Sequence, residues 1–488
     1  MTLRRALGWL TLALLSTPLL AQDAKSVVAN ATRAMGLEGV DSLYYYGTGA
    51  SYSLGQNNNA TIPWPQTPLN DYLRAIDFSQ PASRATWSTY AIPVTGGAAS
   101  LVNAQQVIGP MTPGGWAQQL EIWTTPWGFL KGAAANGATV KSATVAGKRY
   151  RVVSWDAPVK SPGGKAYRVV GYINGDNLVE RTQTWVEHSI YGDLLVESEF
   201  AFYRDNNGLR YPAEWVQKRG GWPVFQLQTL AAWANPADKL QKLLAATPPP
   251  GGAAAPSPAG AASPTAASEE LADGVYQIKG AYNSLAVGFA DHVLLIEPGP
   301  QSEARALAGI AETKRLFPGK PIRYGVITHH HFDHTGGIAA VAAEGITIVT
   351  PEVNKAFLEK ALSGPRTLAP DALAKSGRKA VVEGFRGDKR VFQDATRTVE
   401  VHVIKGLPHA DGLVVAWLPN EKILVYADMF NFPPAAQPVP DPPVIGTQVF
   451  LKNIERLGLQ TDRILSIHTM NPDRLATLDD IRKSLGMP

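Results

Sequence analysis

Residues 328–337, Thr-His-His-His-Phe-Asp-His-Thr-Gly-Gly, place four possible metal ligands within six positions. The ligands are His329, His331, Asp333 and His334. The apolar run at 324–327 predicts a short buried strand before them, and the Gly pair and Ala-rich segment after them predict a helix. Imidazole and carboxylate groups together suit zinc and related divalent ions. Burying so many titratable groups without a metal would be costly, so the stretch predicts a metal site.

This signature resembles that of the metallo-β-lactamase-fold hydrolases. In that family a third histidine, a bridging aspartate and a last histidine follow later in the chain. The sequence supplies each of them at or near the end of an apolar strand: His409, Asp428 and His468. The resemblance covers residues 273–488 and implies an α+β fold, an αβ/βα sandwich with two sheets inside and helices outside.

The resemblance also implies a centre with two zinc ions, although other divalent metals are possible. The first ion would be held by His329, His331 and His409, and the second by Asp333, His334 and His468. Asp428 would bridge the two ions, because each of its two oxygens can serve one of them. A hydroxide bridging the metals would attack a carbonyl, and Asp333 is also predicted as the catalytic residue.

Several neighbouring residues have weaker roles in this interpretation. Relatives commonly have Asp-x-Gly where this chain has Glu297-Pro-Gly, and that acid is expected to hydrogen-bond behind the ligands. We expect His330 to point away from the metals, at the rim of the site. Phe430 and Phe432 could wall an apolar pocket, or could belong to a passive surface loop. The remaining histidines considered are predicted to be structural or on the surface: His188, His292 and His402.

The ligand set favours one type of reaction within the family. Lactonase and glyoxalase II branches carry the bridging aspartate, whereas lactamase branches usually lack it and some use a cysteine, of which this chain has none. We therefore predict hydrolysis of an ester, lactone or thioester. One alternative is a β-lactamase-like amide hydrolase. The other is a protein that binds a lipid or another hydrophobic ligand and carries a non-catalytic metal domain.

Length and composition limit the other possibilities. The 488 residues suggest two or three domains, and the content of 45% hydrophobic and 18% charged residues supports sizeable cores. The net charge is +4, and no Lys/Arg cluster suggests a nucleic-acid partner. We predict a small-molecule substrate. The sequence does not predict an oligomeric state.

The N-terminus predicts export. Arg4 and Arg5 precede an apolar run at 6–20, and a plausible cleavage site follows Ala21, as in a secretory signal peptide spanning residues 1–21. The alternative is a membrane anchor, but the run is shorter than the roughly 20 residues that span a bilayer. Without a cysteine there is no lipid anchor, so we predict a periplasmic or secreted protein. The sequence leaves the general secretory and twin-arginine routes open.

Residues 23–244 predict a β-rich domain that begins with a helix at 23–35. Alternating apolar and polar residues between 42 and 233 predict an antiparallel meander, interrupted by a helix at 126–135. The pattern resembles the half-barrels of periplasmic lipoprotein carriers. Ten of the 12 tryptophans lie here, and we favour a core role for them over a ligand groove.

The Ala/Pro/Gly-rich segment at 245–268 predicts an extended linker to the hydrolase domain at 269–488. In that domain Ser302 is expected to cap a helix, and a last helix is expected at 474–485.

Overall fold

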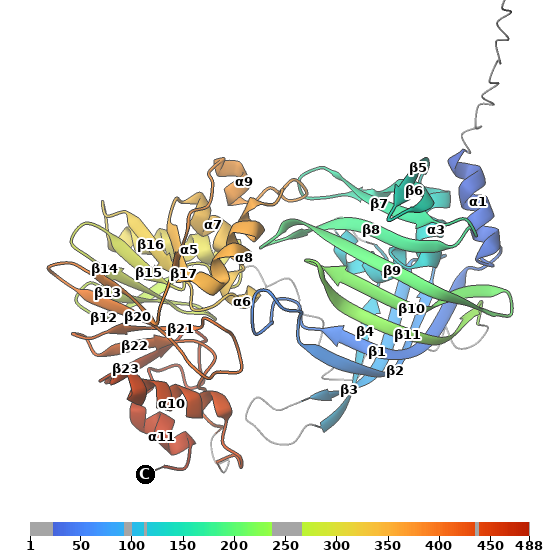
Figure 1. Cartoon of the computed structure of the whole chain (residues 1–488). Coiled ribbons are helices and arrows are strands. Elements are labelled where there is room, and N and C mark those ends of the chain that lie inside the picture. Colours follow the sequence, from blue (N-terminus) through green and yellow to red (C-terminus); the bar gives the residue numbers. More distant parts are fainter. Residues whose placement is uncertain (1–22, 92–99, 112–114, 237–265, 435–438, 488) are drawn as a thin grey trace, which may run out of the picture.

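The computed structural model describes residues 23–91, 100–111, 115–236, 266–434 and 439–487, which form two β-rich halves (Figure 1). The predicted signal peptide lies outside these residues and remains a prediction. Most of the predicted linker also lies outside them, and its last two residues already belong to strand β12, which begins at Ala267. Among the described residues, no helix is long and apolar enough to cross a membrane.

The N-terminal half contains one antiparallel sheet of 11 strands, in the order β4-β3-β2-β1-β11-β10-β9-β8-β7-β6-β5. Strands β1–β4 and β5–β11 form two meanders, which are joined where β1 pairs with β11. The predicted antiparallel meander is therefore confirmed. The strands are β1 (Ser42–Tyr52), β2 (Gln66–Asp77), β3 (Ala82–Ala91), β4 (Ser100–Ile108), β5 (Thr139–Val145), β6 (Lys148–Lys160), β7 (Ala166–Ile173), β8 (Val179–His188), β9 (Gly192–Asn206), β10 (Leu209–Arg219) and β11 (Trp222–Ala234).

The helices of this half share one hydrophobic core with the sheet. They are α1 (Ala24–Ala34), the 3-10 helix η1 (Trp116–Gln119), α2 (Leu120–Trp123) and α3 (Pro126–Ala135). Both predicted helices are present: Asp23 caps α1 by accepting from the Ser26 amide at 2.7 Å, and Thr125 caps α3. The core role is confirmed for four tryptophans that are buried in this core, which are Trp116, Trp127, Trp155 and Trp215.

The C-terminal half contains two sheets, of seven and five strands. Pairing is antiparallel from β12 to β15 and parallel from β15 to β18, whereas in the second sheet only β22 and β23 are parallel. The first sheet consists of β12 (Ala267–Ala272), β13 (Val275–Lys279), β14 (Ser284–Gly288), β15 (Val293–Ile296), β16 (Ile322–Val326), β17 (Thr347–Pro351) and β18 (Val382–Phe385). The second consists of β19 (Lys389–Gln393), β20 (Thr398–Val403), β21 (Val414–Leu418), β22 (Ile423–Tyr426) and β23 (Arg463–Ser466).

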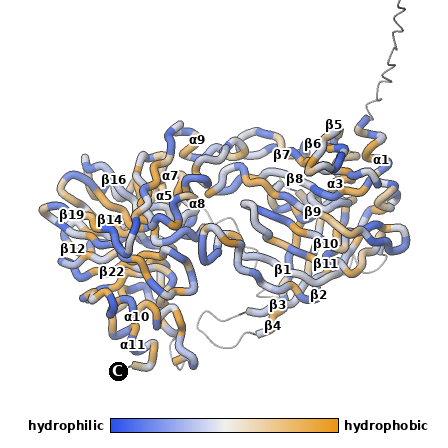
Figure 2. The backbone as a smooth tube through the Cα atoms, viewed as in Figure 1, coloured by the Kyte–Doolittle hydropathy of each residue, from blue (hydrophilic) through white to orange (hydrophobic). Residues whose placement is uncertain are grey.

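Helices cover the outer faces of both sheets, which confirms the predicted αβ/βα sandwich. One core lies between the sheets, and two others lie under the helices. The helices are α5 (Glu303–Leu316), α6 (Phe332–Thr335), α7 (Ile338–Ala343), α8 (Glu352–Ser363), α9 (Ala372–Ser376), α10 (Ile445–Leu457) and α11 (Leu478–Ser484). Figure 2 shows apolar and polar residues alternating along many of the strands and helices, as expected for elements with one buried face.

The predicted last helix begins four residues later than expected, at Leu478. Its cap is Thr477, which forms a capping box with Asp480. Ala476, inside the range predicted as helix, instead forms a β-bridge with Ile464. The cap and the bridge together prevent the helix from starting earlier.

The two halves dock through a segment that we call the strap, residues 364–368. Leu368 is 6% exposed and belongs to the core of the N-terminal half. The backbone of Asp193 donates to the Pro365 carbonyl at 2.7 Å, and the Asp193 carboxylate accepts from the Thr367 amide at 2.9 Å. Arg366 is buried and donates to the carbonyl of Ser189 at 3.2 Å. The strap therefore attaches the C-terminal half to the start of β9 and to the turn between β8 and β9.

A second contact surrounds Phe332, which lies inside the His-rich stretch. Its ring packs against three aromatic side chains of the N-terminal half, at centroid distances of 5.7 Å from Trp64, 5.3 Å from His188 and 5.6 Å from Tyr191. Gly55 has a φ of +83°, and a Cβ there would lie 2.2 Å from the Phe332 ring. Only glycine allows this close approach without strain.

Acid should weaken this contact through His188. Its Nδ1 accepts from the amides of Ile190 at 3.1 Å and Tyr191 at 3.3 Å, so protonation there would break two hydrogen bonds. Burial, together with the charges of Arg219 and Arg366, lowers the pKa of His188 from 6.5 to about 4. The unfolded chain thus takes up the proton first, and this contribution to stability is complete above pH 6.5 and lost as the pH falls toward 4.

We expect the wild type to lose on the order of 2 kcal/mol more unfolding free energy between pH 7 and pH 4.5 than His188→Asn, which keeps an acceptor but does not titrate. Urea unfolding at both pH values measures the difference. Equal losses in the two proteins would contradict the assignment.

Candidate metal centre

The predicted ligands lie at the ends of strands on one edge of the sandwich. His329 follows β16, Asp428 follows β22 and His468 follows β23. The short helix α6 follows His331 and is itself followed by Gly336 and Gly337. A Cβ at Gly336 would lie 2.1 Å from the Gln301 carbonyl oxygen, and one at Gly337 would lie 2.4 Å from the Ser302 carbonyl oxygen. The Gly pair therefore lets the segment between β15 and α5 pack closely against the end of α6.

All seven predicted ligands converge. Their donor atoms form three groups in which every atom lies within 4.8 Å of the others. The groups are His329, His331 and His409; His329, His334 and Asp428; and Asp333, His334 and His468. The first and last groups match the two ligand triads that the sequence predicts.

Asp428 lies between these two triads. Its Oδ1 is 2.9 Å from Nε2 of His468, and its Oδ2 is 2.9 Å from Nε2 of His334. The same Oδ2 is 3.5 Å from Nε2 of His329 and 3.7 Å from Nε2 of His409. Oδ2 thus faces imidazoles of both triads and Oδ1 faces one of the second triad, so the carboxylate lies between the two groups of ligands.

Glu297 supports the ligands from behind. It is 0% exposed; its Oε1 is 2.9 Å from Nδ1 of His334, and its Oε2 accepts from the Thr328 amide at 3.0 Å. Its backbone has a φ of +56°, in the left-handed region that few non-glycine residues occupy. The expectation that this acid reaches the ligands is therefore met, and it directs Nε2 of His334 toward the centre.

The environment keeps most of the ligand imidazoles neutral. Burial lowers the pKa of His329 well below its usual value, and it lowers that of His331 to about 3. The pKa of His409 is shifted in the same direction, mainly by burial. A neutral imidazole has a free lone pair at pH 7, which is what a metal ligand needs.

His334 behaves differently. Burial opposes its charge, but Glu297 and Asp428 outweigh this effect and raise the pKa of His334 to about 10. Although burial opposes this shift too, His334 and His468 hold the pKa of Asp428 well below its usual range. The centre therefore attracts positive charge.

The environment of Oδ2 of Asp428 is a second observation that fits a metal site. Oδ2 of Asp428 is buried and makes no hydrogen bond of acceptable geometry within the described residues, although imidazole nitrogens surround it. His329 and His409 are neutral, so their nitrogens can face this oxygen with lone pairs, an arrangement that is costly unless a cation lies between them. The donor set of five imidazoles and two carboxylates suits zinc. The identity and number of the ions remain predictions.

A cavity of about 490 Å³ opens beside the centre, next to His409 and Asp428. The walls near the ligands are largely apolar and include Leu407, Pro408, Met429, Phe432, Pro433 and Ile445. Phe432 thus lines a pocket, which is one of the two roles that the sequence leaves open for it. Phe430 does not line this pocket but is 2% exposed in the core under α10, where Tyr426 donates to its carbonyl at 2.8 Å.

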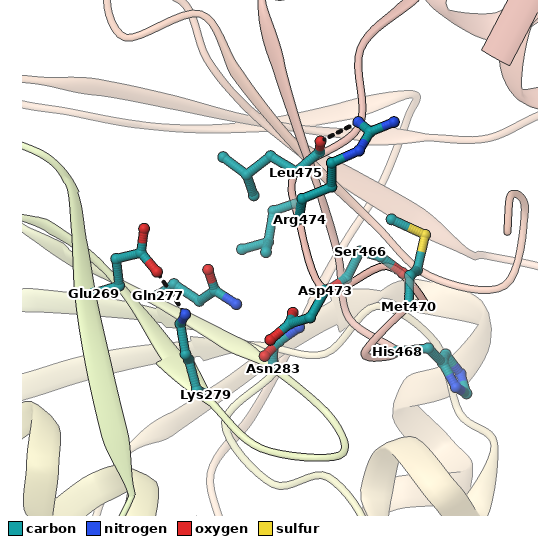
Figure 3. Close-up of a pocket in the computed structure, with 11 residues that line it drawn as sticks. Glu269, Gln277, Lys279, Asn283, Ser466, His468, Met470, Asp473, Arg474 and Leu475 are labelled. Carbon is teal, nitrogen blue, oxygen red and sulfur yellow. Dashed lines mark hydrogen bonds and ion pairs between the residues drawn. The ribbon is translucent and has the colours of Figure 1, made fainter. Parts of the chain in front are cut away.

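A smaller polar cavity of about 200 Å³ lies behind His468 (Figure 3). Lys279 on one wall is paired with Glu269 at 2.6 Å. Arg474 is paired with Asp480 at 2.7 Å. Both cations already have partners, so they give no indication of an anionic ligand.

The sequence missed three residues that touch the ligands: Tyr282, Gln56 and Asn57. The Tyr282 hydroxyl donates to Oδ2 of Asp333 at 2.9 Å, and Gln56 Nε2 donates to Oδ1 of the same group at 2.8 Å. Although burial opposes the shift, His334 and these hydrogen bonds lower the pKa of Asp333. No motif marks these residues, and only the fold brings them to the site.

Of two further histidines, one departs from its expected position and one matches it. The prediction that His330 lies at the rim is wrong, because this residue is 0% exposed and its Nε2 lies 2.8 Å from the Asn57 carbonyl oxygen. It is buried because the N-terminal half covers it. His402 is structural, as expected, and lies 2.8 Å from Glu400.

Comparison with known proteins places the C-terminal half in a family. The model of the metallo-β-lactamase superfamily matches residues 279–468 and does not extend into the N-terminal half. No curated protein matches the chain.

The chain is similar to several solved structures over less than half of its length. TMB-1 is 16% identical, with a TM-score of 0.34, over 46% of this chain and 96% of that one. A metallo-β-lactamase from Pontibacter korlensis is 18% identical, with a TM-score of 0.33, over 46% of this chain and 98% of that one. The sec-alkylsulfatase Pisa1 from Pseudomonas sp. is 20% identical, with a TM-score of 0.31, over 45% of this chain and 40% of that one. At these TM-scores the likenesses say nothing about substrate.

The C-terminal half therefore contains a metallo-β-lactamase superfamily domain, the fold of a metal-dependent hydrolase, with a histidine cluster at the expected edge.

Removing the group behind His334 should weaken metal binding. We expect Glu297→Ala to lower zinc affinity about 10- to 100-fold, because Nδ1 of His334 loses its acceptor and the ring is no longer oriented. Competition with a chromogenic chelator measures the change. Glu344→Gln, which alters a surface ion pair with Lys314, serves as the control and should bind zinc like the wild type. Unchanged affinity in Glu297→Ala would contradict the orienting role.

Proposed function

We propose that the protein is a dinuclear zinc hydrolase that cleaves an ester, lactone or thioester. The observation that supports this most strongly is the pair of ligand triads on either side of Asp428. An aspartate in this position suits two ions that share a carboxylate. When bound, such a pair supplies Lewis acidity and an activated water at neutral pH.

The chain's own residues would organise the reaction. His329, His331 and His409 would hold the first ion, and Asp333, His334 and His468 the second. Asp333 is the ligand that we propose beside the reacting atoms. Tyr282 and Gln56 each donate to one of its oxygens, which fixes the orientation of the carboxylate.

The cavity beside His409 indicates the kind of substrate. Its mostly apolar walls would bind the hydrocarbon part of an acyl or lactone substrate and place the carbonyl near Asp428. No Lys or Arg of the described residues lines this cavity, so nothing in it favours an anionic substrate.

Hydrolysis assays test the proposal directly. We expect zinc-loaded protein to cleave esters, thioesters or lactones and to prefer apolar acyl groups, with loss of activity on chelation and recovery on zinc addition. His331→Ala and Asp428→Asn should lose detectable hydrolysis yet remain folded. His402→Asn, which alters a histidine outside the cluster, should retain activity.

Full activity in either ligand variant would contradict the proposal. Faster turnover of a chromogenic cephalosporin than of any ester or lactone would favour an amide hydrolase instead. Co-purified lipid without any turnover would favour a binding protein.

We also propose that the mature protein acts outside the cytoplasm. The support is the basic and apolar N-terminal pattern ending near Ala21. Expressed with its own N-terminus in a Gram-negative host, the protein should appear in the periplasmic or extracellular fraction, and its mass should fit cleavage after Ala21. A deletion of residues 2–21 should keep it in the cytoplasm. An uncleaved, cytoplasmic full-length protein would overturn this proposal.

A further inference from the structure

The loop between β1 and β2, residues 53–65, reaches from the N-terminal half to α6 (Figure 1). We call it the capping loop. Hydrogen bonds within the loop define its conformation: the Ser53 amide donates to the Pro65 carbonyl at 2.9 Å, and the Asn57 amide group donates to the carbonyls of Asn59 at 2.6 Å and Ile62 at 2.9 Å. Asn57 is 1% exposed. The loop thus presents a fixed surface to the metal centre.

The capping loop contacts two of the candidate ligands directly. Gln56 Nε2 donates to Oδ1 of Asp333 at 2.8 Å, and the Asn57 carbonyl oxygen lies 3.0 Å from Nε2 of His331. It also reaches the loop that carries His409, where the Asn58 amide group donates to the Pro408 carbonyl at 3.2 Å. The contacts therefore involve a ligand of each triad.

The Asn57 contact determines which nitrogen of His331 is available. A carbonyl oxygen only accepts, so Nε2 of His331 must carry the hydrogen, which leaves the Nδ1 lone pair free for a metal. The other two ligand histidines of the stretch have outer partners within the C-terminal half: Thr328 for Nδ1 of His329, at 3.2 Å, and Glu297 for Nδ1 of His334, at 2.9 Å. The outer partner of His331 comes from the N-terminal half.

We infer that the capping loop completes the metal centre, with Gln56 and the Asn57 carbonyl as positioning groups for Asp333 and His331. This inference deepens the proposed function and rests on it. The N-terminal half is then part of the site that binds the metals, and it fixes the ligand geometry.

Metal titration tests the role of Gln56. Gln56→Leu keeps the size of the side chain but removes the donor, so Asp333 loses one of its two hydrogen-bond partners. We expect one of the two zinc ions to bind about 10- to 100-fold more weakly, with the other little changed. The visible spectrum of the cobalt-substituted variant should change as well, because the second site loses its geometry.

The matched control is Asp193→Ala. It breaks the contact with the strap, at Thr367 and Leu368, but touches no candidate ligand. We expect both ions to bind as in the wild type. Wild-type affinity and an unchanged cobalt spectrum in Gln56→Leu would overturn the inference, as would an equal loss of affinity in Gln56→Leu and Asp193→Ala.

The Asn57 carbonyl cannot be removed by substitution, so a reciprocal measurement tests it. If the loop orders the ligands, metal binding must stabilise loop docking by the same free energy. We expect zinc to slow amide hydrogen exchange in residues 53–65 more than in the strap. Gly55→Ala, whose Cβ would meet the Phe332 ring, should abolish this added protection. Equal exchange in the capping loop with and without zinc would contradict the inference.

These results separate the inference from the proposed function. Wild-type protein that binds two ions and hydrolyses nothing would contradict the proposed function and leave the inference standing. Full activity and unchanged metal affinity in Gln56→Leu would contradict the inference and leave the proposed function standing. Wild-type protein that binds no zinc would contradict both.

Discussion

The structure depends on one largely buried carboxylate, Asp428, which lies among imidazoles contributed by separate parts of the chain. Its oxygens lie within 3.7 Å of four histidine nitrogens, and one of those oxygens lacks a hydrogen bond within the described residues. Such an arrangement is costly in a low-dielectric interior unless positive charge compensates it. The strand ends that carry these groups must therefore stay in register. Both sheets of the sandwich contribute such strand ends and hold them in place.

The same requirement explains why the second half of the molecule matters to the site. Each ligand imidazole needs a partner on its outer nitrogen, and the C-terminal half supplies Glu297 and Thr328 for two of them. Nε2 of His331 faces the N-terminal half, which supplies its partner. The capping loop provides Asn57, and Gln56 at the same time reaches Asp333. The capping loop therefore both joins the two halves and contacts two of the ligands.

The sequence predicted what depends on short spacing. Six residues hold four ligands, so the chain itself indicates the site, and the resemblance that these residues carry implies the sandwich around it. The alternation of apolar and polar residues is also local, and it indicates the antiparallel meander. The sequence could not predict contacts made across the two halves: Gln56 and Asn57 belong to an ordinary polar loop, and nothing in the chain indicates what covers His330. The core position of Phe430 was missed because it depends on packing under α10. The late start of α11 was missed because a capping box sets it.

Leu368 has a consequence for how the protein is made. It fills a place in the core of the N-terminal half, yet it lies far downstream in the chain. During synthesis the first half emerges with that place vacant and with the aromatic surface for Phe332 uncovered. Its apolar groups stay partly open to water until the later strap arrives, and exposed surface of this kind invites misassociation. Chaperones that bind nascent chains would therefore matter most for this protein before the strap has been synthesised.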